Sequence, residues 1–132
     1  MPTRTGTVIV VDDDTAVRNA LKFALELEGL TVILCESGRD VLDRQHLPAS
    51  GCLVIDYRMA EMDGFQLISE LRERQVSLPA ILLTSQVNAD LRQRATEAGF
   101  FDVLEKPLHD SSLFDTVRAA LAFVPSSEQE GS

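Results

Sequence analysis

Residues 8–14 read VIVVDDD, an uninterrupted run of β-branched residues that ends in three aspartates. Four consecutive apolar residues without polar alternation are typical of a strand that is covered on both faces, as in a parallel sheet. The run is too short and too acidic at its end to be a signal peptide, and no stretch of the chain approaches the ~20 apolar residues of a membrane-spanning helix. We therefore expect a buried strand whose carboxyl end carries acidic side chains.

Runs of the same kind recur along the chain and alternate with segments of helical periodicity. The expected strands are 8–11, 31–34, 52–55, 80–83 and 100–104. Apolar spacing predicts helices over about 15–28 and then after Ser37, from Phe65, between Asn88 and Gly99, and from Leu113. Crossovers between parallel strands are right-handed in about 98% of cases, so the helices should cover both faces of one sheet. Five βα units are too few for a β/α barrel and predict an α/β fold, a doubly wound sheet of five parallel strands in the order 2-1-3-4-5.

The composition excludes several classes of function. The 132 residues suit one domain, and a formal net charge of −9 opposes binding to nucleic acid or to an anionic membrane surface. Two cysteines cannot build a disulfide framework, and the sequence signatures of P-loop NTPases, zinc peptidases and α/β-hydrolases are missing. Because no targeting segment is visible, we expect a cytoplasmic domain.

Polar side chains follow the ends of four expected strands that are neighbours in this order. They are Asp12 and Asp13, then Asp56, Thr84 and Lys106. Adjacent strands lie about 4.8 Å apart, so these groups should face one crevice. Two carboxylates about 4 Å apart repel by roughly 4 kcal/mol at an effective dielectric of 20, which calls for a counter-ion such as Mg²⁺. Asp56, on the central strand, is the candidate for a carboxylate nucleophile.

Four segments of this chain match a known family in order and spacing. They are VIVVDDD (8–14), LVIDYRMAEMDG (53–64), ILLTS (81–85) and LEKP (104–107). The chain therefore resembles the receiver domain of two-component response regulators, the CheY-like superfamily, over about residues 7–122, and is similar to its FixJ-type members. The resemblance implies a flavodoxin/CheY-like receiver domain over 1–123. The remaining residues, VPSSEQEGS (124–132), hold Pro, Ser, Glu and Gly without core positions and predict a flexible tail or the start of a linker.

The resemblance also implies a metal site. In receivers an acidic pair holds Mg²⁺ together with the phosphoacceptor and a backbone carbonyl. Carried onto this sequence, the pair is Asp12 and Asp13, the phosphoacceptor is Asp56, and the carbonyl belongs to Arg58. Mg²⁺ is the implied cofactor.

The remaining roles follow from the same resemblance. Asp56 would take a phosphoryl group from a sensor histidine kinase or phosphotransfer protein, Lys106 would contact that group, and Thr84 would move onto it as the switch. The Lys106–Pro107 bond resembles the family's cis peptide. The switch would act on the surface of the fourth helix, fifth strand and fifth helix, where family members dimerise or contact outputs. Such a domain is not a multiple-turnover enzyme, and its output domain is either missing from this chain or a separate protein.

Two departures from the family leave alternatives open. Val103 stands where receivers usually have an aromatic residue, and Ala60 where they often have proline. A pseudo-receiver that binds a partner without phosphorylation is therefore one alternative. A second is a small phosphatase resembling the haloacid dehalogenase superfamily, whose Asp-x-Asp-x-Thr motif is met by Asp12 and Asp14 but has Ala16 in place of the threonine.

Some prominent residues have an ordinary structural interpretation. Asp14 is expected to cap the helix that follows it. Cys35 and Cys52 are expected to be reduced thiols on or beside buried strands. Arginines on two expected helices are interpreted as solvated surface residues, with the second pair open to a partner interface: Arg72 and Arg74, then Arg92 and Arg94.

Overall fold

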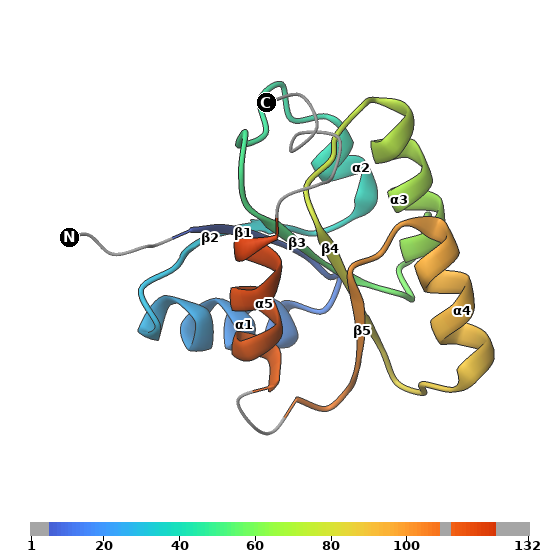
Figure 1. The fold of residues 1–132 in the computed structure, drawn as a ribbon. Coiled ribbons are helices and arrows are strands. Elements are labelled where there is room, and N and C mark those ends of the chain that lie inside the picture. Colours follow the sequence, from blue (N-terminus) through green and yellow to red (C-terminus); the bar gives the residue numbers. More distant parts are fainter. Residues whose placement is uncertain (1–5, 109–111, 124–132) are drawn as a thin grey trace.

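A computed structural model describes residues 6–108 and 112–123, and within them strands and helices alternate along the chain (Figure 1). The expected tail, 124–132, lies outside the described residues. No helix in the described part is long and apolar enough to cross a membrane. The elements are β1 (Thr7–Val11), α1 (Thr15–Leu27), β2 (Thr31–Cys35), α2 (Gly38–Leu42), β3 (Cys52–Asp56), α3 (Gly64–Glu73), β4 (Ala80–Thr84), α4 (Ala89–Ala98), β5 (Asp102–Glu105) and α5 (Ser112–Ala122).

The five strands form one parallel sheet in the order β2-β1-β3-β4-β5, which confirms the predicted topology. Helices α1 and α5 lie on one face of the sheet, and α2, α3 and α4 lie on the other (Figure 1). Successive side chains of β1 point to opposite faces of the sheet. Val8 and Val10 pack with the cluster under α1 and α5, whereas Ile9 and Val11 pack with the cluster under α2, α3 and α4. This double burial explains the unbroken apolar runs in the sequence.

Side-chain caps define where the helices start. Asp14, Ser37 and Asn88 each accept a hydrogen bond from a backbone N–H in the first turn of α1, α2 and α4. Asp63 and Gln66 form a reciprocal capping box at the start of α3. The predicted capping role of Asp14 is therefore confirmed, and its carboxylate is committed to the helix.

The fifth strand starts later than predicted. It was expected from Phe100, but β5 begins at Asp102. Gly99 ends α4 with φ 101°, and the N–H of Phe100 then donates to the carbonyl of Ala95 at 2.9 Å. Phe100 therefore completes the C-terminal cap of α4 and is not part of the strand. An apolar run in the sequence does not distinguish a residue in such a cap from the first residue of a strand.

The interpretation of the arginines as solvated residues is correct for Arg74, Arg92 and Arg94, which are exposed, but wrong for Arg72, which is half-buried. Arg72 donates to the carbonyls of Val76, Leu78 and Gly99 at 2.7, 3.0 and 3.0 Å, and Arg74 donates to a carbonyl at the end of α2. These two guanidinium groups join α3 to neighbouring loops and helices.

Arg94 of α4 is exposed but also contacts a ring, since its guanidinium carbon lies 4.5 Å from the ring centre of Phe65. The Phe65 ring also meets Tyr57 and Phe100 edge-on, with centroids 5.4 and 5.7 Å apart. We call these four residues the aromatic cluster. It joins the loop after β3 to α3 and α4.

Candidate functional site

Three carboxylates meet at the carboxyl edge of the sheet, where β1 and β3 lie side by side. Asp12 and Asp13 follow β1, and Asp56 is the last residue of β3; each offers an oxygen, and these oxygens lie within 4.8 Å of one another. Asp12 is 1% and Asp56 6% exposed, whereas Asp13 is open to solvent. The predicted meeting of these groups is confirmed, because β1 and β3 pair directly with Val11 opposite Ile55.

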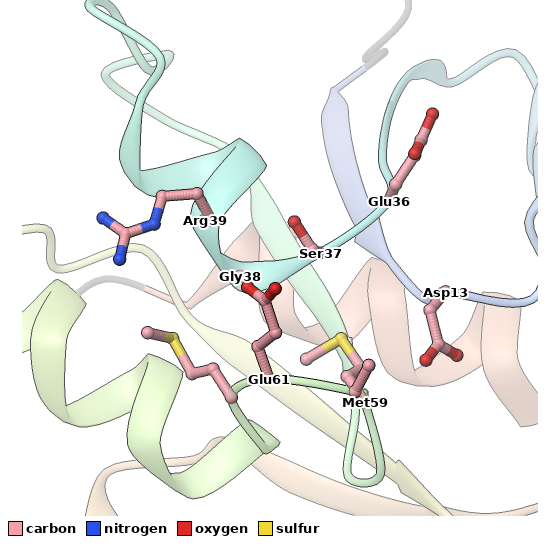
Figure 2. Close-up of a pocket in the computed structure, with 9 residues that line it drawn as sticks. Asp13, Glu36, Ser37, Gly38, Arg39, Met59 and Glu61 are labelled. Carbon is pink, nitrogen blue, oxygen red and sulfur yellow. The ribbon is translucent and has the colours of Figure 1, made fainter.

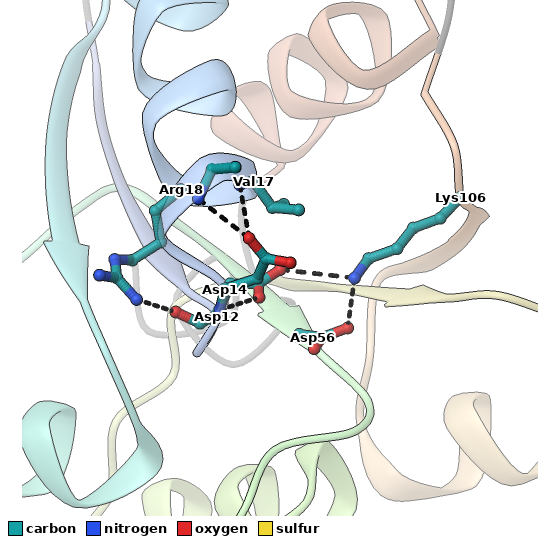
Figure 3. A network of polar contacts seen from close by, with 7 residues as sticks. Asp12, Asp14, Val17, Arg18, Asp56 and Lys106 are labelled. Atoms are coloured by element: carbon teal, nitrogen blue, oxygen red, sulfur yellow. Dashed lines mark hydrogen bonds and ion pairs between the residues drawn. The ribbon is translucent and has the colours of Figure 1, made fainter.

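Lys106 reaches this group from the end of β5. Its Nζ lies 2.9 Å from Oδ1 of Asp56 and 3.5 Å from Oδ2 of Asp12, so one ammonium bridges both buried carboxylates (Figure 3). The Lys106 N–H donates to the carbonyl of Thr84 at 2.8 Å, and the Lys106–Pro107 peptide is cis, as expected. Asp12, Asp13, Asp56 and Lys106 are called the acidic site below.

Burial and neighbouring charges perturb both partners of the closer ion pair. Desolvation raises the pKa of Asp56, the hydrogen bond from Lys106 opposes that shift, and the charge of Asp12 adds to it. For Lys106, burial on its own would lower the pKa, but the hydrogen bond and charge of Asp56 and Asp12 outweigh burial, and the pKa is raised. One lysine therefore stays charged while it faces more negative charge than it can neutralise.

Thr84 lies at the same edge but outside this network of charges. It ends β4, beside β3, where Asp56 pairs with Leu83. Thr84 is 5% exposed, and its Oγ1 donates to the carbonyl of Gln86 at 3.3 Å and accepts from the Gln86 N–H at 3.5 Å. The hydroxyl therefore has a local partner, two residues away, and no hydrogen bond to the carboxylates.

Arg58 lies in the loop between β3 and α3. Its side chain is exposed, and its guanidinium carbon lies 5.4 Å from the ring centre of Tyr57. The loop is closed at its base, because the N–H of Gly64 donates to the carbonyl of Tyr57 at 2.9 Å. The role of the Arg58 carbonyl as a metal ligand stays a prediction.

Sequence reasoning missed Arg18 of α1, which contacts the main chain of the acidic site rather than its carboxylates. Its Nη1 donates to the main-chain carbonyl of Asp12 at 2.7 Å (Figure 3). The sequence signal for this contact is a basic residue six positions after an acidic one. That spacing is too common to identify Arg18 as a functional residue.

An open cavity of about 280 Å³ lies beside Asp13 (Figure 2). Its walls are Glu36 in the loop after β2, Arg39 in the first turn of α2, and the loop after β3, with Met59 and Glu61. The exposed carboxylate of Asp13 borders this space, so solvent, ions and small solutes can reach the acidic site from this side.

The donor set suits a hard divalent cation. Three carboxylates with oxygens within 4.8 Å are the ligand type that Mg²⁺ prefers, and the acidic site contains no thiolate or imidazole that would select a softer metal. The ion-paired lysine offsets one negative charge and leaves an excess for a cation. The residues present therefore fit the metal that the resemblance implies.

Comparison with known proteins identifies the family. Residues 8–118 match the response regulator receiver domain. The chain is 42% identical over 123 residues to the transcriptional regulatory protein TdiR of Thauera aromatica, covering 91% of this chain and 54% of TdiR. It is also 40% identical to an uncharacterized 14.6 kDa protein of Leptolyngbya boryana, with 89% of this chain and 92% of that protein covered. This chain belongs to the response regulator receiver domain family.

A solved structure agrees in fold and in subgroup. Full-length FixJ from B. japonicum superposes with a TM-score of 0.83 at 31% identity, over 96% of this chain and 63% of that one. The chain thus spans about half the length of TdiR and under two thirds of FixJ. As a receiver domain with an acidic pocket formed by Asp12, Asp13 and Asp56 and joined by Lys106, it has the features of a phosphoacceptor switch in two-component signalling and is not an enzyme in the usual sense.

Proposed function

We propose that this domain accepts one phosphoryl group on Asp56, from a histidine kinase or phosphotransfer protein, and that the acylphosphate alters the surface of α4, β5 and α5. The ion pair between Asp56 and Lys106 carries this proposal. It places the one buried carboxylate of β3 at the centre of the acidic site, with a cation 2.9 Å from its Oδ1.

The chemical step forms one bond and breaks one. A carboxylate oxygen of Asp56 attacks the phosphorus of a phosphohistidine, the P–N bond breaks, and its electron pair stays on the imidazole nitrogen. Burial of Asp56 removes the water that would otherwise stabilise its charge, and Lys106 keeps the carboxylate oriented by its hydrogen bond. Later attack by water on the acylphosphate releases inorganic phosphate and restores the carboxylate.

Asp12, Asp13 and Asp56 are the residues that would hold Mg²⁺, with the Arg58 carbonyl as a further ligand. The ion would offset negative charge as phosphate approaches three carboxylates. Lys106 would supply a second positive charge to the phosphoryl oxygens, since its ammonium already lies between Asp12 and Asp56.

Thr84 is the proposed switch residue. Its hydroxyl is buried and its present contacts with Gln86 are long, at 3.3 and 3.5 Å, so a phosphoryl oxygen on Asp56 would offer a stronger, charged acceptor. Rotation of Thr84 toward Asp56 would vacate the space that its side chain now fills on the side of β4 facing α4. The loop leading into α4 would then repack to fill that space. The ligand thereby shifts a two-state equilibrium.

The partners follow from the family. TdiR and FixJ are longer than this chain, and TdiR is a transcriptional regulatory protein, which supports an output domain beyond this chain. The Leptolyngbya boryana protein is 92% covered, which supports the alternative of a separate target protein. We propose that phosphorylation changes homodimerisation or output contact through α4, β5 and α5, in the cytoplasm.

The test is an intact-mass measurement after incubation with acetyl phosphate and Mg²⁺. We expect the wild-type protein to gain one phosphoryl group, and Asp56→Asn to gain none. A wild-type sample with excess EDTA serves as the metal control. A folded wild-type protein that gains nothing would contradict the proposal and support the pseudo-receiver alternative.

One feature disfavours the phosphatase alternative. A haloacid dehalogenase-like site needs the second aspartate of its motif to face the substrate, but Asp14 accepts hydrogen bonds from the N–H groups of Ala16 and Val17 at 2.9 and 3.2 Å. Its carboxylate is thus held by the first turn of α1. Release of phosphate at a multiple-turnover rate from a phosphomonoester would restore that alternative.

A further inference from the structure

Arg18 makes an unusual contact for a residue in the first turns of a helix. Its side chain turns back toward the end of β1, where Nη1 donates to the Asp12 carbonyl at 2.7 Å (Figure 3). Its Nη2 donates to Oγ1 of Thr15, the first residue of α1, at 3.2 Å. Arg18 is half-buried. A planar guanidinium can hold two acceptors in fixed directions, which an ammonium cannot do equally well.

With this contact, every polar atom of Asp12 has a partner. Its N–H donates to the carbonyl of Cys35, and its carbonyl accepts from Arg18. Its Oδ1 accepts from the N–H of Asp14 at 2.9 Å, and its Oδ2 accepts from Lys106 at 3.5 Å. The carbonyl is the only one of the four groups that depends on a helix side chain.

That carbonyl belongs to the peptide plane that leads into Asp13. A peptide unit is planar, so a hydrogen bond that directs the Asp12 C=O also directs the Asp13 N–H on the opposite side of the plane. Among the described residues no hydrogen bond restrains the Asp13 carboxylate itself, which is exposed. Arg18 therefore holds the Asp12–Asp13 peptide plane, and the orientation of that plane helps to set the direction of the Asp13 side chain.

We propose that Arg18 is a positioning residue of the acidic site: by holding the Asp12–Asp13 peptide, it keeps the two carboxylates where they bind Mg²⁺ together, and so raises the affinity for the metal without touching it. This inference rests on the proposed function, because it assumes that the acidic site is a metal site.

Charge and position predict opposite effects, which makes the inference testable. Arg18 brings a positive charge close to a cation site, so a purely electrostatic role would make its removal tighten Mg²⁺ binding. A positioning role makes removal weaken binding. Partners that orient metal ligands typically change affinity by about 10–100-fold, and since Arg18 acts on the main chain we expect about tenfold.

The experiment is a Mg²⁺ titration followed by tyrosine fluorescence, because Tyr57 is the only tyrosine, next to Asp56, and the chain has no tryptophan. We expect Arg18→Met to bind Mg²⁺ about tenfold more weakly than wild type, and Arg18→Lys, which keeps the charge and one donor, to fall between them. Arg39→Met is the matched control. It removes a positive charge from the exposed wall of the cavity beside Asp13, and should leave Mg²⁺ affinity unchanged or slightly higher.

A second measurement needs no metal. Amide hydrogen exchange in EDTA should be faster at Asp14 in Arg18→Met than in wild type or Arg39→Met, because the bond from the Asp14 N–H to Asp12 Oδ1 loosens with the peptide. A circular dichroism spectrum equal to that of wild type excludes a general loss of fold.

The outcomes separate this inference from the proposed function. Equal or tighter Mg²⁺ binding by Arg18→Met, with wild type binding normally, would overturn the positioning role alone. No Mg²⁺ binding by wild-type protein would overturn the metal site of the proposed function and this inference with it.

Discussion

The acidic site and Thr84 lie at the same edge of the sheet, but they are held in different ways. Every polar atom of Asp12 has a hydrogen-bond partner, and its carboxylate shares one lysine with Asp56. Thr84 has only two long contacts, both with Gln86, two residues away. The difference teaches that the proposed phosphoryl-accepting site is already held in place, whereas Thr84, the proposed switch residue, can exchange its hydrogen-bond partners with little loss of free energy.

The apolar surroundings of the two parts differ as well. On β5, next to the strand that carries Thr84, Val103 is 4% exposed in the core beneath α4, at the position where the resemblance leads us to expect an aromatic ring. Three rings lie instead in the aromatic cluster, which runs from Tyr57, next to Asp56, through Phe65 to the C-terminal end of α4. The loop after β3 is therefore linked to α4 through Phe65 of α3, by rings that do not include position 103.

The largest effect is expected where the acidic site loses its only cation. Lys106→Met leaves two carboxylates, 1% and 6% exposed, without a counter-charge. Breaking a buried ion pair costs about 3–5 kcal/mol, and because the Lys106 side chain is 26% exposed we expect the free energy of unfolding to fall by about 2–3 kcal/mol. Urea unfolding in EDTA measures this.

Lys22→Met is the matched control, because Lys22 pairs with Glu26 on the exposed face of α1. Such pairs contribute about 0.3–0.5 kcal/mol. An equal loss of unfolding free energy in Lys106→Met and Lys22→Met would show that the ion pairs of Lys106 stabilise the fold no more than an exposed pair on α1 does.

The aromatic cluster should show the next largest effect. Phe65→Ala removes the ring that contacts Tyr57, Phe100 and Arg94, and we expect a loss of about 2 kcal/mol in unfolding free energy, below the range for fully buried rings because Phe65 is partly exposed. The fluorescence of Tyr57 should change as well.

Phe114→Ala on α5 provides the comparison on the opposite face of the sheet, where Phe114 also has an arginine over its ring. It should lower stability without altering Tyr57 fluorescence. A fluorescence change of the same size in both variants would contradict a separate aromatic cluster beside the phosphoacceptor loop.

A smaller effect of opposite sign is expected at Asp13. Asp13→Asn removes one charge from a group of three carboxylates, and without metal we expect the free energy of unfolding to rise by about 1 kcal/mol, since site residues are often held at the expense of stability. The stabilisation that Mg²⁺ gives to wild type should be lost in the variant. Thermal melts with EDTA and with Mg²⁺ measure both, and a variant that still responds fully to Mg²⁺ would exclude Asp13 as a ligand.

Ionisation of the two buried thiols should have no effect on the free energy of unfolding near neutral pH. Burial raises the pKa of Cys35 to about 11 and that of Cys52 to about 12, from 9.0. Near pH 7, well below 9.0, the thiols are protonated in both the folded and unfolded states, so their ionisation does not change the free energy of unfolding. Between pH 9 and 11 the unfolded chain loses protons that the folded chain keeps, so stability should fall as the pH rises.

Thiol labelling at pH 8 checks this prediction, with slow reaction of both cysteines in the folded protein and fast reaction in urea. Fast labelling of the native protein would show that these strands open readily.

The sequence by itself determined the sheet, its strand order, and the meeting of Asp12, Asp13, Asp56 and Lys106. Those predictions succeeded because buried parallel strands leave unbroken apolar runs, and because parallel strands bring their carboxyl ends to one edge. Capping residues such as Asp14 were also predictable, since a cap acts within three residues.

Only the tertiary structure decided what the long side chains contact. Arg18 reaches back to the carbonyl of Asp12, Arg72 reaches Gly99, and Arg94 covers Phe65 from another helix. Phe100 closes α4 instead of starting a strand. The physical reason is that periodicity reports how deeply each element is buried, whereas the partner of a flexible arginine or of a ring depends on which other elements the fold brings within a few ångströms of it.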